Sequence, residues 1–241
     1  MVEQGKRYLE HVYSKGKVVH GDYTHRLTDE IVSRFISREV CEGGRLSMLD
    51  VGCGMGGQAK AFSRYFTMYG TDISDKASEL FEESAVPFTF KACNFEIERL
   101  PFPDDFFCII FSKSLIEHIN NTDKLMADMY RVLKPGGICI LMTPAWETQY
   151  KHFYDDYTHV KPFTRHGLRS ALCVNNFSNV NVTEFYQLPY VWKYPFLKIL
   201  PIVISKIFPD SFKFKGSNRS TARKWIRFSK ETMLLGFGKK S

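Results

Sequence analysis

The stretch from Met48 to Gly57 constrains the fold more than any other part of the chain. It reads M-L-D-V-G-C-G-M-G-G, a short strand-like run followed by four glycines in six positions. The pattern predicts a buried strand that stops at a tight turn, because glycine permits backbone conformations that a Cβ atom disfavours. The next residues, 58–66, predict a helix whose unpaired N–H groups face the turn. A strand, a glycine turn and a helix in this order indicate a nucleotide-binding site.

An acidic residue follows at the end of the next predicted strand. Asp72 lies 22 positions after Asp50, at a place where a carboxylate can accept hydrogen bonds from both hydroxyls of a ribose. An NAD site would use the same geometry. These two features therefore predict an adenosine-containing ligand without choosing among such ligands.

The middle of the chain alternates between predicted strands and helices, which favours a parallel sheet with helices on both faces. An unbroken apolar run such as C-I-I-F is typical of a strand that is buried on both sides. Further strands are expected at 68–72, 88–92, 108–112, 138–143, 180–185 and 232–237, and helices at 28–40, 75–84, 122–133 and 164–174. Thr28 and Thr164 are the expected caps of their helices.

Several segments together resemble the class I S-adenosylmethionine (SAM) methyltransferases. They are D-V-G-C-G at the glycine turn, N-F-E at 94–96, S-K-S-L-I-E-H-I at 112–119 and R-V-L-K-P-G-G at 131–137. The resemblance covers residues 46 to about 145. It implies a Rossmann-like, seven-stranded, mostly parallel sheet, with SAM as the methyl donor. The cofactor-binding residues that it implies are Asp50, Gly52, Cys53, Gly54, Gly56, Asp72, Ile73, Asn94, Phe95 and Ser112.

We expect one domain over residues 1–241, in which 1–45 form a helical cap, 46–185 and 232–241 form the core, and 186–231 form an insertion between the last two strands. The insertion is apolar, but prolines and lysines interrupt it too often for a transmembrane helix, which needs about 20 largely uncharged residues. Residues 193–241 carry twelve Lys or Arg against two acids, so they contribute +10 to a chain of net charge +7. The insertion is therefore expected to be a lid, an acceptor-binding element or a peripheral membrane contact through 188–230.

Methylation of a neutral hydroxyl needs a general base, and two loops offer one. His118 follows the fourth strand, and the polar stretch 154–163 follows the fifth. We assign His159 as the base, Asp156 as its supporting carboxylate and His118 as a further candidate. Asp155, Asp156 and His159 are an alternative set of metal ligands, but no dedicated metal motif occurs, so no metal ligand is assigned and the need for a divalent metal is left open.

The stretch D-D-Y-T-H-V-K-P-F-T resembles one in methyltransferases encoded with polysaccharide or O-antigen synthesis enzymes. This implies O-methylation of a sugar or glycolipid hydroxyl. The alternatives are methylation of a lipid or quinone-like small molecule, or a non-catalytic SAM-binding protein. A nucleic-acid substrate is not expected, since no N-P-P-Y-like segment follows the fourth strand. The charged N-terminus lacks the apolar run of a signal peptide, which favours a cytoplasmic protein, peripheral to the membrane if the insertion contacts lipid. The oligomeric state is left open.

Overall fold

The computed structural model describes residues 22–36, 45–76, 78, 81–82, 86–208 and 221–241. Seven strands form one sheet in the order β3-β2-β1-β4-β5-β7-β6. The first five strands are parallel, and β7 runs antiparallel to both of its neighbours. This arrangement confirms the predicted fold class. The strands are β1 (Ser47–Val51), β2 (Thr67–Asp72), β3 (Phe88–Ala92), β4 (Phe107–Lys113), β5 (Leu133–Pro144), β6 (Ser178–Phe185) and β7 (Met233–Lys239).

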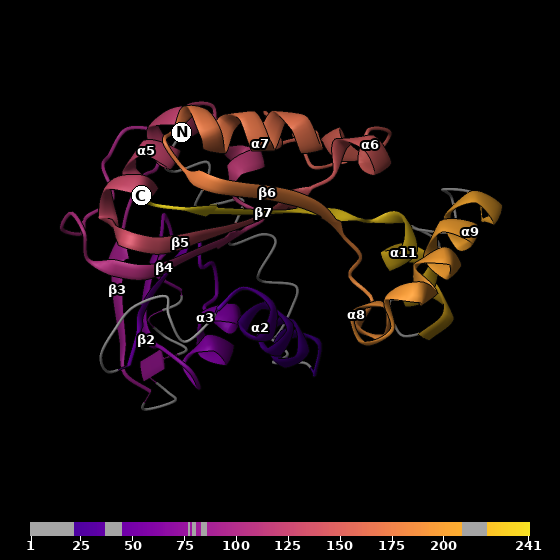
Figure 1. The fold of residues 1–241 in the computed structure, drawn as a ribbon, viewed down its shortest axis with the longest axis horizontal. Helices are drawn as coiled ribbons and strands as arrows, with labels where there is room; N and C mark the ends of the chain where they lie inside the picture. Colours follow the sequence, from indigo (N-terminus) through magenta and orange to yellow (C-terminus); the bar gives the residue numbers. More distant parts are fainter. Residues whose placement is uncertain (1–21, 37–44, 77, 79–80, 83–85, 209–220) are drawn as a thin grey trace.

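Helices cover both faces of the sheet (Figure 1). On one face lie α5 (Thr122–Val132) and α7 (Arg165–Val174), and on the other lie α2 (Asp22–Phe35) and α3 (Gly57–Phe62). The central strands contain unbroken apolar runs, such as residues 108–111 in β4, because successive side chains enter opposite cores. In β5, for example, Leu141 packs in the same core as the buried residues of α5, whereas Ile140 packs in the core that holds Phe62.

Side-chain caps fix where two of these helices begin. Thr164 accepts a hydrogen bond from the N–H of Gly167 at 3.0 Å, as predicted for the start of α7. Asn121 accepts one from the N–H of Lys124 at 3.2 Å and starts α5 in the same way. Each cap satisfies an N–H that has no partner inside its helix.

The predicted start of the first helix is wrong. The helix α2 begins at Asp22, so Thr28 lies inside it and caps nothing. The Thr28 hydroxyl donates to the carbonyl of Thr24 at 3.0 Å and accepts from Gln58 Nε2 at 2.7 Å. A polar residue that suggested a helix terminus from sequence is instead buried, because it ties α2 to α3. The predicted extension to residue 40 lies outside the described residues.

Other boundaries also differ from the predictions, among them those of α3, α5 and β5. The helix α3 ends at Phe62, four residues early, and α5 ends at Val132. The strand β5 begins at Leu133, so it includes the K-P-G-G segment that was expected only to stop the helix. The N–H of Gly136, which has a φ of +77°, donates to the carbonyl of Lys240 at 2.9 Å. Pairing with the C-terminal end of the chain thus extends the strand. The helix expected at 75–84 falls partly outside the described residues.

The insertion between β6 and β7 forms short helices. They are α8 (Pro189–Lys193), η3 (Pro195–Lys198), α9 (Ile199–Ile207) and α11 (Thr221–Lys230). Since β7 runs antiparallel to both β5 and β6, β6 points the same way as β5, and the insertion leaves from the carboxyl edge of the sheet. It projects beyond that edge, at the same end as α6 (Trp146–Gln149) (Figure 1). In the part of the chain that the structure describes, no helix combines the length and apolar character needed to cross a membrane.

Candidate active site

The glycine turn after β1 has the backbone that the sequence predicted. Gly52, Gly54 and Gly56 have φ values of +76°, +53° and +75°. Residues that carry a Cβ atom rarely adopt such values. A Cβ atom at Gly52 would also lie 2.9 Å from Cδ2 of Leu115, in the loop after β4. Glycine is therefore required here both for the turn and for the close approach of two loops.

Two buried carboxylates flank this turn. Asp72 Oδ2 accepts from the N–H of Gly54 at 2.8 Å, and its Oδ1 accepts from the N–H of Ser74 at 3.1 Å. Asp50 is 2% exposed, and its Oδ2 has no hydrogen-bond partner among the described residues. Burial, with the charge of Asp72 as a further cause, raises the pKa of Asp50 to about 7. A buried acceptor without a donor fits a ligand that carries hydroxyl or amine donors, and the adenosine and amino-acid groups of SAM supply both.

The other predicted cofactor residues lie around the same edge, and several of their side chains already have partners. Ser112 donates to the carbonyl of Val51 at 2.8 Å and so joins β4 to β1. Asn94 Oδ1 accepts from the N–H of Glu96 at 3.2 Å. The side chain of Phe95 packs in the hydrophobic core. Cys53 is buried in the turn, and Ile73 is half-buried beside Asp72. Their roles toward SAM stay predictions.

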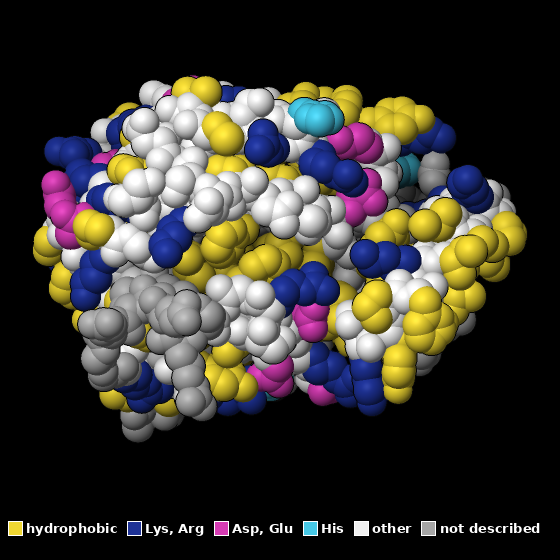
Figure 2. Space-filling view, in the orientation of Figure 1, with side chains coloured by type: hydrophobic (Ala, Val, Ile, Leu, Met, Phe, Trp, Pro, Cys, Tyr) yellow, Lys and Arg dark blue, Asp and Glu magenta, His cyan; other side chains and the backbone are white. Residues whose placement is uncertain are grey.

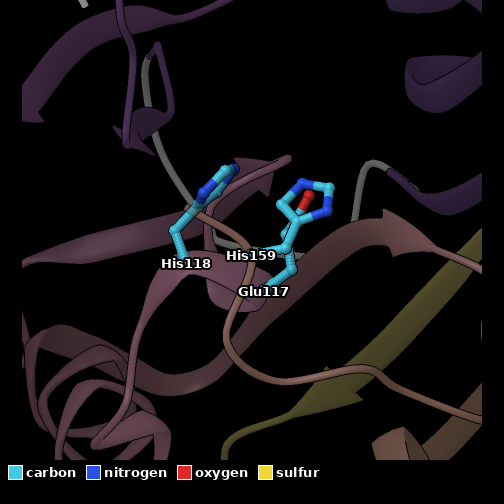
Figure 3. Close-up of side chains that lie close together, drawn as sticks. All are labelled: Glu117, His118 and His159. Atoms are coloured by element: carbon cyan, nitrogen blue, oxygen red, sulfur yellow. The ribbon is translucent and has the colours of Figure 1, made fainter. Parts of the chain in front are cut away.

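A second group of polar residues forms where the loops after β4 and β5 meet. The 3-10 turn η1 (Ile116–His118) follows β4. The backbone N–H groups of Val160 and Lys161, in the loop after β5, donate to the carbonyl of Glu117 at 2.8 and 3.1 Å. These bonds place His159 beside His118, with 4.6 Å between ring centroids (Figure 3). The structure thus brings together two of the three predicted catalytic residues from different loops.

A hydrogen-bonded chain orients His118. The Thr158 hydroxyl lies 2.6 Å from Asp156 Oδ1 and 2.9 Å from His118 Nδ1. An ionised carboxylate can only accept, so the hydroxyl donates to Asp156 and accepts from Nδ1–H of His118. This assignment leaves Nε2 of His118 with a lone pair. Burial, followed by the neighbouring His159, lowers the pKa of His118, which favours the neutral ring.

A backbone carbonyl orients His159. Its Nδ1 lies 2.6 Å from the carbonyl oxygen of Phe153, in the turn η2 (Phe153–Asp155), and its ring packs on the Phe153 ring at 4.5 Å. Because a carbonyl only accepts, Nδ1 carries the proton and Nε2 is the basic nitrogen. The predicted support of His159 by Asp156 stays a prediction. The side chain of Asp156 is connected to His118 through Thr158, and the ring of His159 is held by Phe153.

Glu117 is a site residue to which the sequence interpretation gave no role. It is fully buried, its Oε2 accepts from the Thr143 hydroxyl at 2.9 Å, and its Oε1 has no partner among the described residues. Burial raises its pKa to about 7. The signal available in the sequence was a single acid within the apolar run L-I-E-H-I.

Glu117, His118 and His159 each offer one ligand atom, and these atoms all lie within 4.8 Å of one another. Imidazole nitrogens and a carboxylate oxygen are ligands that Zn²⁺ and other transition metals accept. The three residues could therefore hold a metal ion, an assignment that the sequence did not suggest.

Comparison with known proteins agrees with this geometry. Residues 49–141, which include the glycine turn, Asp72 and η1, match the family model of a methyltransferase domain. This match covers less than half of the chain and shows that these residues are similar to a methyltransferase domain. The residues that match the family model stop within β5, so the loop with His159 and the insertion lie outside the part of the chain that this model covers.

Two curated relatives differ in the reactions that their names describe. The chain is 27% identical over 181 residues to the biotin biosynthesis bifunctional protein of Teredinibacter turnerae, covering 67% of this chain and 32% of that protein. It is 32% identical over 131 residues to the ubiquinone/menaquinone biosynthesis C-methyltransferase of Psychromonas ingrahamii, covering 49% and 52%. This chain therefore spans about half or less of these relatives, and they do not identify its acceptor.

Solved structures share the fold of this methyltransferase domain at low identity. A putative sarcosine dimethylglycine methyltransferase from Galdieria sulphuraria matches with a TM-score of 0.64 and 17% identity, covering 99% of this chain and 98% of that one. A Haemonchus contortus phosphoethanolamine N-methyltransferase, solved in complex with SAM, matches with a TM-score of 0.61 and 19% identity, covering 89% and 52%.

Proposed function

We propose that this methyltransferase transfers the methyl group of SAM to a hydroxyl of a sugar, either nucleotide-linked or lipid-linked, with His159 as the general base. The observation that carries the proposal is the pairing of His118 and His159 beside the buried carboxyl of Glu117. When bound, SAM supplies an electrophilic methyl group on a sulfonium. The protein's own residues must then bind the acceptor, orient its hydroxyl and take its proton.

In this proposal the proton of the acceptor hydroxyl is taken up by His159. As the new bond forms between the acceptor oxygen and the methyl carbon, the bond from that carbon to sulfur breaks, and the hydroxyl proton passes to Nε2 of His159. A placed base of this kind contributes about 10²–10⁴-fold to the rate. The bond from Nδ1 to the Phe153 carbonyl holds the ring in the tautomer that can accept this proton. Nε2 of His118 and the carboxyl of Glu117 are then available to bind neighbouring hydroxyls of the acceptor.

The surface around this cluster suits a sugar. Three tyrosines of the loop after β5 are exposed, namely Tyr150, Tyr154 and Tyr157. An exposed tyrosine offers a flat apolar face together with a hydroxyl, which is the combination that packs against a pyranose ring and bonds its hydroxyls. The resemblance of the D-D-Y-T-H-V-K-P-F-T stretch to polysaccharide-associated methyltransferases supports the same acceptor class.

A second acceptor class, a lipid or quinone-like molecule, is favoured by the exposed apolar residues of η3 and α9 at the same edge of the sheet. Incubation of the protein with methyl-labelled SAM and separate pools of nucleotide sugars, lipid-linked glycans and glycan-free lipids distinguishes the two. We expect the label on a sugar hydroxyl. Label that appears only in the glycan-free lipids would reject the sugar proposal, and SAM binding without turnover in any pool would favour the non-catalytic alternative.

A further inference from the structure

We infer that the outer face of η3 and α9 docks this protein on an anionic membrane surface. The inference goes beyond the proposed function and does not depend on the acceptor, since it concerns where the protein works. It is carried by the exposure of apolar side chains on one helix, by the lysines around them and by the place of that helix in the fold.

Exposed apolar residues are concentrated in this part of the molecule. Seven of the fifteen large hydrophobic residues that are exposed in the described chain lie within residues 194–207. Phe196, Ile199 and Ile207 are the most open, with 76%, 64% and 67% of their surface exposed. Figure 2 shows hydrophobic side chains gathered with Lys and Arg at the end of the molecule where α9 projects. The other four exposed hydrophobic residues within 194–207 are Tyr194, Leu200, Ile202 and Val203.

The arrangement of α9 is the reverse of an ordinary surface helix. At about 100° per residue, its exposed residues share roughly half of the circumference. Five of them are apolar and one is Lys206. The other half faces the protein and contains the buried Pro201 and the half-buried Ile204 and Ser205. An exposed apolar face of this kind is typical of a site that binds a protein partner or a membrane.

The neighbouring helices hold that face in position. Lys230 Nζ of α11 donates to the carbonyl of Ser205 in α9 at 2.9 Å. The rings of Tyr190 in α8 and Trp225 in α11 stack with 4.2 Å between centroids. The apolar face is therefore built on a supported element and is not a frayed end.

The charge of this segment identifies the partner as an anionic lipid surface. The sequence from Tyr186 to Phe208 contains three lysines and no acidic residue. Lys193, Lys198 and Lys206 are all exposed. Lysine can place its aliphatic stem along apolar surface while its ammonium reaches lipid phosphates. Apolar side chains with a lysine rim, on a helix too short to span a bilayer, are typical of binding in the interfacial plane.

The position of α9 relates the proposed docking surface to the candidate active site. The insertion and α6 lie at the same end of the sheet (Figure 1), which is the carboxyl edge that also holds His118 and His159. A protein resting on α9 would keep this edge close to the lipid headgroups. An acceptor anchored in the bilayer would then meet the site without leaving the membrane.

Sedimentation with vesicles tests the inference directly. The full-length protein is mixed with vesicles of phosphatidylcholine alone, or of equal parts phosphatidylcholine and phosphatidylglycerol, and the bound fraction is measured. We expect binding to the anionic vesicles, weakened at least about fivefold by Ile199→Ser with Ile207→Ser and by Lys198→Ala with Lys206→Ala. The matched control, Ile97→Ser with Val174→Ser, removes two similarly exposed apolar residues from other surfaces and should bind like the wild type.

Several outcomes would overturn the inference. One is the absence of binding to either kind of vesicle, and another is equal weakening by the Ile199/Ile207 pair and by the control pair. A dimer in solution that becomes monomeric when Ile199 and Ile207 are replaced would assign the face to a second copy of the chain. Because none of these measurements uses turnover, their result is independent of the acceptor assay.

Discussion

The imidazole rings of His118 and His159 lie 4.6 Å apart, although each belongs to a loop after a different strand. Both rings have Nδ1 engaged, by Thr158 and by the carbonyl of Phe153, so both present Nε2 as the basic nitrogen. The backbone of Glu117 and the hydrogen bond between Thr158 and His118 hold the two loops together. A base assembled in this way depends on the position of a loop as well as on the chemistry of a side chain.

Replacement of His159 by alanine should separate catalysis from cofactor binding. We expect turnover to fall at least about a hundredfold, because the acceptor proton loses its base. The affinity for SAM, measured by calorimetry, should change less than about twofold. His166→Ala, at an exposed position in α7, is the matched control. An equal loss of SAM affinity would mean that the loop closes over the cofactor and that His159 has a structural role.

Replacement of Gly52 by alanine should destabilise the protein and weaken SAM binding. Gly136 provides a matched control, since its φ of +77° is nearly the same as the +76° of Gly52. Both changes carry a backbone cost of about 1–2 kcal/mol, but only at Gly52 does the new Cβ meet Leu115 at 2.9 Å, whereas at Gly136 its nearest neighbour is 3.9 Å away. Denaturant unfolding should therefore show the larger loss for Gly52→Ala.

The extra loss at Gly52 can be traced to its cause with a double-mutant cycle. Leu115→Ala removes the two Cδ atoms that a new Cβ would meet at 2.9 and 3.1 Å, although the Cβ of residue 115 stays at 3.1 Å. The change should therefore cost less in the Gly52→Ala background than in the wild type. Strict additivity of the two changes would contradict the collision as the explanation.

The buried carboxyl of Glu117 should make stability depend on pH. Its pKa is raised from 4.5 to about 7, first by burial, with Asp156 also raising it and Lys113 lowering it. The folded state therefore holds this proton more tightly than the unfolded state, and stability falls as pH rises from about 4.5 through 7. A difference of this size corresponds to about 3 kcal/mol.

Glu117→Gln tests that dependence, because an amide of similar shape does not ionise. We expect a smaller loss of unfolding free energy between pH 5 and about 8 in the variant than in the wild type. Part of the slope should remain, since Asp50 has its pKa raised into the same range. Asp75→Asn, at an exposed position, controls for the loss of one negative charge. An unchanged slope in Glu117→Gln would show that this carboxyl does not titrate in the window.

Removal of divalent metals should leave turnover unchanged. The ligand atoms of Glu117, His118 and His159 all lie within 4.8 Å of one another and could hold an ion, but the proposed reaction uses these residues to bind and deprotonate the acceptor. Dialysis against EDTA followed by the methyl-transfer assay measures this. Activity lost with EDTA and restored by Mg²⁺ or Mn²⁺, together with Mn²⁺ binding that His118→Ala abolishes, would contradict the prediction.

The sequence was sufficient to predict the existence of the seven strands, although only some of them, such as β4, contain an apolar run. Thr28 and the K-P-G-G segment were misinterpreted for a shared reason. A hydrogen bond from Gln58 and the pairing of Gly136 with Lys240 come from distant parts of the chain, and no local pattern reveals them.

The candidate site was predictable only in part. Gly52 and Asp72 belong to one continuous strand–helix–strand unit, β1-α3-β2, so their proximity follows from the order of the elements. His118 and His159 meet through the backbone of Glu117, and nothing in the spacing of the two histidines indicates that contact. The hydrogen bond between Thr158 and Asp156, which extends to His118, was likewise not indicated by the sequence.

The placement of β7 between β5 and β6 has a consequence for how the protein can change. Since β6 and β7 are antiparallel neighbours, everything between them is topologically the loop of a hairpin, whose two ends emerge side by side. Such a loop can lengthen, shorten or be exchanged between related genes without disturbing strand register or the glycine turn on the other side of the sheet. New acceptors or new cellular surfaces can thus be acquired there while the methyl-donor half of the protein is inherited intact.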